Sequence, residues 1–286
     1  MNQLAQRRKV GQTWRMAKSK QAYPTDLNDK EFEVIAPYLP APAATGHPRE
    51  HAWRTILNAI FYLTRSGCAW RMLPRDLPPW KTIYHYFRLW RKDGTWERIN
   101  TALRESVRTQ AGRQPQASAA ILDSQSVKTA EGGVERGYDA GKKVTGRKRH
   151  LIVDTLGLVL LVVVTAGSVQ DRDGAKDLLQ ALFERVKKSK YSRWCRLKLI
   201  WADGSYRGAL IDWVKSRLGW TLEIVAKLGG QVGFQVLPKR WIVERTFAWL
   251  NRQRRLGKDY ERLPETSEAF VYVAMIRLML RRLAHA

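Results

Sequence analysis

The sequence predicts an α/β fold, in which a mixed sheet flanked by helices follows a small all-helical region. Apolar residues first recur at helical spacing, in segments separated by Pro- and Gly-containing turns. Beyond residues 112–118, a Gly/Pro/Gln/Ala/Ser stretch, short apolar runs of strand type alternate with helical patterns. With 286 residues, 44% of them hydrophobic, the chain is long enough for one large domain or two modest ones.

The strong positive charge indicates a polyanionic partner. Lys and Arg number 51 against 26 Asp and Glu, a formal net charge of +25, which favours nucleic acid. The longest apolar stretch, 156–166, is too short to span a bilayer, so we expect no membrane partner. Cys68 and Cys195 are the only cysteines and predict neither a disulfide framework nor a zinc site. No signal-peptide pattern is visible, and a cytoplasmic protein is the expectation.

The first part of the chain predicts short helices after a basic arm. Residues 1–22 hold six Lys/Arg and no acid, and we expect a flexible arm. Cap residues at 25–33 precede a first helix, and a second helix begins near Glu50. Helices over 81–92 and 95–109 follow. The Arg- and Trp-rich pattern over 23–111 predicts a helix-turn-helix-like DNA-binding domain, and a plain helical bundle with tryptophans in its core is the alternative.

The second part of the chain predicts a sheet covered by helices. After a linker at 112–118, a catalytic domain is expected over 119–262, followed by a C-terminal helix over 263–286. The order is strand, hairpin, helix, strand, helix, strand, helix, which is the layout of an RNase H-like domain. The expected ranges are 119–124, 150–154 with 158–165, 173–187, 197–202, 209–218, 221–227 and 240–254.

Three carboxylates are candidates for one metal site. Asp123 and Asp203 each end a short apolar run of strand type, and Glu244 lies early in an Arg-rich helical segment. Converging carboxylates are what two-metal phosphoryl chemistry requires, and magnesium prefers oxygen ligands. Each acid also has a structural interpretation, as a turn former or an i,i+4 ion-pair partner. Asp154 and Asp171 are rivals, and Asp171 is also a candidate for supporting the metal ligands.

Several motifs resemble bacterial insertion-sequence transposases of the DDE type. They are Ile-Leu-Asp-Ser-Gln-Ser-Val-Lys at 121–128, Gly-Arg-Lys-Arg-His-Leu-Ile-Val-Asp-Thr at 146–155, Trp-Ala-Asp-Gly-Ser-Tyr-Arg-Gly at 201–208 and a block at 241–261. Segments 58–63, 67–74 and 94–98 also match, so the similarity covers the chain from about Tyr23 to Tyr260. The resemblance implies an RNase H-like core, with Asp123, Asp203 and Glu244 as a catalytic triad that holds Mg²⁺, or alternatively Mn²⁺.

The sequence departs from the signature of a sister group of these transposases. That signature places Tyr, Arg, Glu and Lys around the glutamate. Arg240 and Glu244 fit it, but Leu237 stands in the Tyr position and Asn251 in the Lys position. Other basic residues must then assist at the terminal phosphate.

Two clusters of basic residues are candidates for DNA contacts. The first lies in the loop predicted beside the first catalytic strand, and the second follows Glu244. A solubilising surface run is the alternative for the first cluster, and surface ion pairs with Asp259 and Glu261 for the second. The candidates are Lys143, Arg147, Lys148, Arg149, Arg245, Arg252, Arg254 and Arg255.

The resemblance implies a DNA transposase that binds the terminal inverted repeats of its element and performs metal-dependent strand cleavage and strand transfer. Its partners would be double-stranded DNA, at the repeats and at the target, and a second copy of the chain, as a dimer assembled on DNA. Two other functions remain open: a catalytically silent DNA-binding protein and an RNase H-type nuclease. The helical region before the sheet argues against the nuclease, which has no need to recognise element ends.

Overall fold

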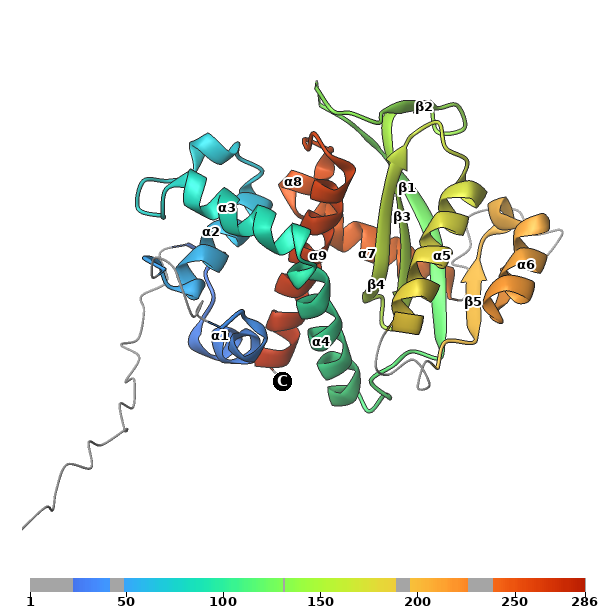
Figure 1. Ribbon diagram of the computed structural model, residues 1–286, viewed down its shortest axis with the longest axis horizontal. Coiled ribbons are helices and arrows are strands. Elements are labelled where there is room, and N and C mark those ends of the chain that lie inside the picture. The colour runs from blue at the N-terminus through green and yellow to red at the C-terminus, as the bar shows by residue number, and fades with distance from the viewer. Residues whose placement is uncertain (1–22, 42–48, 131, 189–195, 226–238, 286) are drawn as a thin grey trace, which may run out of the picture.

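The computed structural model describes residues 23–41, 49–130, 132–188, 196–225 and 239–285, with a helical part beside a mixed sheet (Figure 1). The predicted arm at 1–22 lies outside the described residues. None of the described helices is long and apolar enough to cross a membrane.

Four α-helices form the first part of the chain, as predicted. Helix α1 begins with a capping box, in which Asn28 and Glu31 each accept a hydrogen bond from the other's backbone N–H. Gly67 ends α2 with a φ of 74°, and a Cβ there would lie 3.0 Å from the Arg254 Cβ, so glycine serves both the turn and the close packing. The helices are α1 (Asp29–Ile35), α2 (Trp53–Ser66), α3 (Trp80–Lys92) and α4 (Thr95–Gln110).

The sheet has the mixed topology expected of an RNase H-like domain. Its strands run in the order β2-β3-β1-β5-β6, and β4 also pairs with β3. Strand β1 is antiparallel to β3 and parallel to β5, and the predicted hairpin is formed by β3 and β4. The strands are β1 (Ala119–Lys128), β2 (Gly137–Asp139), β3 (Val144–Asp154), β4 (Val159–Ala166), β5 (Leu199–Ala202) and β6 (Thr221–Ile224).

Helices cover both faces of this sheet. One face packs against α5 (Asp171–Lys188), α6 (Ala209–Trp213) and the helical turn Val214–Leu218 that continues α6. The other face packs against α4, α7 (Arg240–Asn251) and α9 (Pro264–Ala284). The helix predicted over 240–254 is interrupted: α7 ends at Asn251, and a short α8 (Arg254–Gly257) follows.

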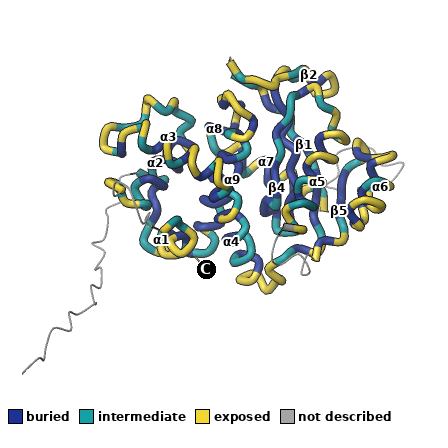
Figure 2. The backbone as a smooth tube through the Cα atoms, in the orientation of Figure 1, coloured by how far each residue is buried: buried dark blue, intermediate teal, exposed yellow. Residues whose placement is uncertain are grey.

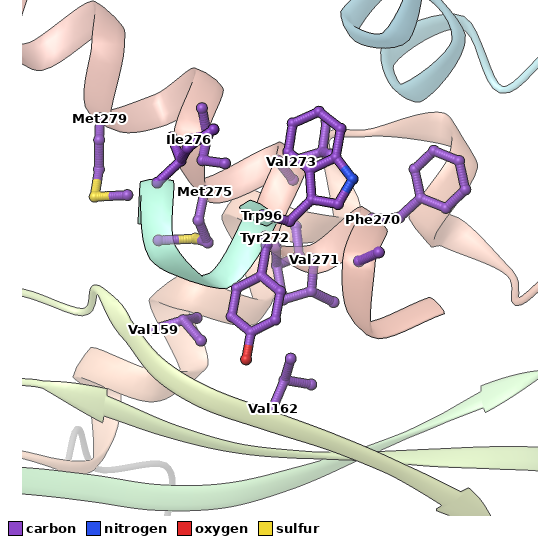
Figure 3. Close-up of a cluster of buried hydrophobic side chains, with 14 of the residues drawn as sticks. Trp96, Val159, Val162, Phe270, Val271, Tyr272, Val273, Met275, Ile276 and Met279 are labelled. Carbon is purple, nitrogen blue, oxygen red and sulfur yellow. The ribbon is translucent and has the colours of Figure 1, made fainter. Parts of the chain in front are cut away.

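Helix α9 joins the helical part of the chain to the sheet. Its middle is buried between the N-terminal helices and β4 (Figure 2). In Figure 3, Tyr272 of α9 lies above Val159 and Val162 of β4, with Trp96 of α4 nearby. One continuous apolar cluster therefore includes residues of α2, α3, α4, α9 and the sheet.

A buried ion pair reinforces this junction. The Arg108 Nη1 of α4 lies 2.7 Å from the Asp154 Oδ2 at the end of β3, and the two side chains are 6% and 0% exposed. Asp154 also accepts hydrogen bonds from the backbone N–H groups of Leu156 and Leu158 in the hairpin turn. Asp154 thus has a structural role.

We predict that Arg108→Ala lowers the free energy of unfolding by about 3–5 kcal/mol, because it leaves the buried Asp154 carboxylate without its cation. Urea denaturation followed by circular dichroism measures this. Arg185→Ala is the matched control: Arg185 pairs with Glu97 but is 47% exposed, and its loss should cost at most about 1 kcal/mol. Equal losses in the two variants would contradict the assigned role.

Candidate active site

Strand pairing places Asp123 of β1 and Asp203, directly after β5, on the same face of the sheet. Strands β1 and β5 are parallel, and Ile121 lies opposite Trp201. Because side chains alternate along a strand, Asp123, two residues on, points to the same face as Ile121, and Asp203 follows Trp201 in the same way. Ile121 and Trp201 belong to the apolar cluster on the α7 side. Both acids are therefore directed toward α7.

Arg240 connects the second acid to the third. Helix α7 packs over β1 and carries both Arg240 and Glu244, one turn apart. The Arg240 Nη2 lies 3.5 Å from the Asp203 Oδ2 and 3.4 Å from the Glu244 Oε1. A single guanidinium nitrogen is thus shared by two of the three predicted acids. The Glu244 side chain is 51% exposed and lies on the open side of the site.

Burial and a neighbouring acid disfavour the ionised form of Asp123. Burial raises the Asp123 pKa to about 6, and the nearby Asp203 carboxylate contributes to the increase. A hydrogen bond from the Ser124 backbone N–H, 2.7 Å from the Asp123 Oδ1, opposes the shift, as do the charges of Arg240 and Lys142. The basic groups of the site therefore do not offset the cost of burying the ionised Asp123 carboxylate.

The carboxylates of Asp123, Asp203 and Glu244 offer the oxygen ligands that suit a divalent cation, although they do not converge on one point. Within the described parts of the chain, no group of three His, Cys, Asp or Glu side chains is arranged to hold a metal ion. Asp203 and Glu244 instead share the positive charge of Arg240. Oxygen ligands of this kind suit Mg²⁺, and the raised Asp123 pKa shows that a further cation would stabilise the ionised site.

A polar network supports β1 from the opposite face of the sheet. The Asp171 Oδ1 accepts a hydrogen bond from the Ser124 Oγ at 2.9 Å and lies 3.0 Å from the Lys148 Nζ, which is also 3.3 Å from the Asp139 Oδ2. Burial alone would raise the Asp171 pKa, but the hydrogen bonds from Lys148 and Ser124 outweigh it and lower the pKa. The supporting role expected for Asp171 therefore has a geometric basis.

Sequence patterns did not indicate two members of this environment. Asp139 lies on the short strand β2 and accepts a hydrogen bond from the Ser126 Oγ at 2.5 Å. The Lys142 Nζ lies 3.3 Å from the backbone oxygen of Ser124, close enough for its charge to act on Asp123. Both belong to the segment that leads into β3. Its basic run, Lys-Lys-Val-Thr-Gly-Arg-Lys-Arg at 142–149, was the only signal that pointed to it.

Burial corrects four of the predicted DNA contacts. Arg147 and Arg149 are fully buried, Lys148 is 6% exposed and Arg255 is 7% exposed. Arg147 pairs with Asp259 at 3.2 Å, and the Arg255 Nε lies 2.7 Å from the Glu261 Oε1. Arg149 donates to the Leu256 backbone oxygen. Because these groups have internal partners and little or no access to solvent, their role is structural.

The other four predicted contacts lie partly or fully at the surface. Lys143, Arg252 and Arg254 are exposed. Arg245 is half-buried, with its guanidinium 4.4 Å from the Trp241 ring centre and 4.7 Å from that of Trp249. Arg245 and Arg252 do not form the predicted alternative ion pairs with Asp259 and Glu261: Asp259 pairs with Arg147, and Glu261 pairs with Arg255 of the same cluster.

Comparison with known families agrees with this arrangement. The family model described as Transposase DDE domain matches residues 114–280, more than half of the chain, and the chain belongs to this family. A second model, the putative transposase of IS4/5 family, matches residues 27–100. The two models together cover most of the chain and are both described as transposase families.

Two curated relatives come from Burkholderia cepacia. The putative transposase for insertion sequence element IS402 is 29% identical over 131 residues, which are 44% of this chain and 59% of that protein. The insertion element IS402 uncharacterized 16.2 kDa protein is 27% identical over 121 residues, 39% of this chain and 78% of that protein. The chain thus spans less than two thirds of the first relative. No solved structure matches the chain.

We predict that Asp123→Asn stabilises the metal-free protein by about 1–2 kcal/mol at pH 8 and has no effect near pH 4. The folded pKa of Asp123, about 6, lies above its ordinary value, so the wild type loses stability as pH rises through 6. An asparagine cannot ionise and avoids that loss. Chemical denaturation in EDTA at both pH values measures it.

Asp212→Asn, at an exposed position on α6, is the control for removing one carboxylate. It should change stability little at either pH. A destabilisation by Asp123→Asn at pH 8 that equals its effect at pH 4 would contradict the raised pKa.

Proposed function

We propose that this chain binds the terminal inverted repeats of its insertion element and catalyses metal-dependent DNA strand cleavage and strand transfer. The observation that carries the proposal is that Arg240 links Asp203 to Glu244, while Asp123 lies on the same face of an RNase H-like sheet as Asp203. The family match supports the class of reaction.

Asp123, Asp203 and Glu244 would hold divalent magnesium, with manganese as a substitute, on this proposal. When bound, such ions activate the attacking oxygen and stabilise the leaving oxygen in phosphoryl transfer. The protein itself fixes the positions of the carboxylates. The backbone N–H of Ser124 donates to Asp123, and the Ser205 N–H, at 2.8 Å, donates to the Asp203 Oδ1. Gly204, where an added Cβ would contact nothing within 4 Å, leaves space for a sugar-phosphate backbone.

Exposed cations near the site are the proposed DNA contacts. Lys143 follows the loop beside Asp139, and Arg252 and Arg254 lie after the end of α7. Arg245 would present the edge of its guanidinium between two tryptophan rings. Double-stranded DNA of the repeats and of the target would meet this surface, with two copies of the chain assembled as a dimer.

We predict that Asp123→Ala and Asp203→Asn each abolish magnesium-dependent cleavage of the element's own terminal repeats while DNA affinity stays within about twofold, because each change removes a metal ligand and no cation. A strand-cleavage assay and fluorescence anisotropy measure the two properties. Asp212→Asn serves as the control and should retain cleavage. Metal-dependent cleavage by either triad variant would show that other residues carry the reaction.

A second test concerns Arg240, which is held between two of the proposed metal ligands. We predict that Arg240→Gln tightens Mn²⁺ binding several-fold, because the variant removes a cation that competes for the same carboxylates. Electron paramagnetic resonance titration measures free Mn²⁺. Arg207→Gln, exposed after the Gly204–Tyr206 turn, is the charge-matched control. Unchanged or weaker binding in Arg240→Gln would mean that Arg240 does not compete with the metal.

A further inference from the structure

A cavity lined by arginines lies between α2, the end of α7 and α9. Its volume is about 290 Å³, near the lower limit for small-ligand pockets. Apolar walls come from Phe61, Leu250 and Met275 among others. No described Asp or Glu lines it, whereas four cations do: Arg65, Arg252, Arg277 and Arg281.

One of the four arginines is buried, and the other three are exposed. Arg277 is buried, 9% exposed, and its guanidinium lies 2.6 Å from the Glu31 carboxylate. Its Nε has no acceptor among the described residues. Arg65, Arg252 and Arg281 are exposed around it. The cavity therefore has three exposed arginines and one buried arginine among its lining residues.

Among the described residues, the exposed charges around the cavity are not balanced by acids. None of the three exposed arginines forms an ion pair with a described carboxylate. Burial lowers the Arg277 pKa, Glu31 opposes this, and the charge of Arg281 lowers it further. Arg65 donates to the Arg252 backbone oxygen, which holds α2 against the end of α7. Like charges held together around a partly enclosed space repel, and a bound anion relieves that repulsion.

We propose that this cavity binds a backbone phosphate of DNA, outside the catalytic acids. The inference rests on the proposed function, because it assigns a second contact to the same DNA. Arginine side chains match phosphate oxygens with paired N–H donors. The cavity contains room for a phosphate and part of its sugar, and its apolar walls suit the latter.

The position of the cavity on α7 connects it to the active site. Glu244 and Arg252 lie eight residues apart, about 12 Å along the helix axis. A DNA strand carries one phosphate about every 3.4 Å along its axis. A duplex whose reacting phosphate lies at Glu244 therefore has further phosphates within reach of Arg252 and the cavity.

The competing explanation is purely structural. Arg277 and Arg281 lie toward the C-terminal end of α9, and Arg252 ends α7, where cations stabilise the helix dipole. On that explanation, neutralising the arginines would lower thermal stability without changing how DNA binding depends on salt. The phosphate explanation makes the opposite prediction, so the two can be separated.

The test compares DNA binding by the full-length wild type and the Arg65→Gln/Arg281→Gln variant in EDTA, so that catalysis does not contribute. Fluorescence anisotropy with a labelled duplex, between about 50 and 200 mM NaCl, gives the slope of log K against log salt. We expect the variant to reduce the magnitude of that slope by about 1 to 2 and the affinity at 100 mM NaCl by about tenfold. Lys215→Gln/Arg217→Gln, exposed beyond α6 at the far end of the sheet (Figure 1), should leave the slope unchanged.

The outcomes distinguish this inference from the proposed function. An unchanged slope in the Arg65→Gln/Arg281→Gln variant, with the wild type still binding DNA, overturns the cavity site and leaves the proposed function intact. Absence of DNA binding by the wild type overturns both. The change in melting temperature on addition of inorganic phosphate tests whether the cavity binds free phosphate or a phosphate of DNA. If phosphate stabilises only the wild type while the DNA slopes are equal, the cavity binds free phosphate and the DNA assignment is wrong. Should the double variant fail to fold, Arg281→Gln alone should give about half the slope change.

Discussion

The parallel pairing of β1 with β5 is the constraint on which the active site depends. It sets Ile121 opposite Trp201, and the alternation of side chains then directs Asp123 and Asp203 to the face that α7 covers. A shift of one residue in this register would turn Asp123 toward α5, where the network of Ser124, Asp171 and Lys148 now lies. The register is held by apolar contacts on both faces of β1, so the packing of the whole sheet positions the acids.

Some of the positively charged side chains in this protein are buried and stabilise its structure, and others lie at its surface. The net charge of +25 suggests a general attraction to DNA, yet Arg108, Arg147, Arg149 and Arg255 are buried and hold loops or helices in place. Arg240 is different, because it neutralises acids of the site itself. The cations left for DNA are therefore fewer than the sequence suggests. Around the cavity between α2, α7 and α9, the three exposed arginines have no counter-charge among the described residues.

Patterns over a few residues predicted the helices and strands well. The predictions that were wrong concern side chains whose partners lie far away in the sequence. Helical spacing, the cap at Asn28 and the β-branched hairpin strands act over a few residues, and the structure confirms the helices and the hairpin that they predict. The acids were recognisable because Asp123 and Asp203 each follow a short apolar run and Glu244 lies early in an Arg-rich helix; the structure extends the first strand beyond Asp123 to Lys128. The burial of Arg147 and Arg149 was not, since their acceptors, Asp259 and the Leu256 carbonyl, lie more than 100 residues away. For the same reason the sequence did not predict the ion pairs of Arg240, which depend on α7 packing over β1. Nor did it predict the apolar cluster that extends from α4 through α9 into the sheet.

The central claim is that Asp123, Asp203 and Glu244 together form a cation site. Anomalous diffraction from crystals of the full chain soaked in Mn²⁺ tests it most directly. The account predicts an anomalous peak in contact with carboxylate oxygens of Asp123 and Asp203, with the Arg240 guanidinium withdrawn from at least one of its two carboxylates. A saturated crystal with Arg240 still shared between Asp203 and Glu244, and with manganese bound only elsewhere, would contradict it.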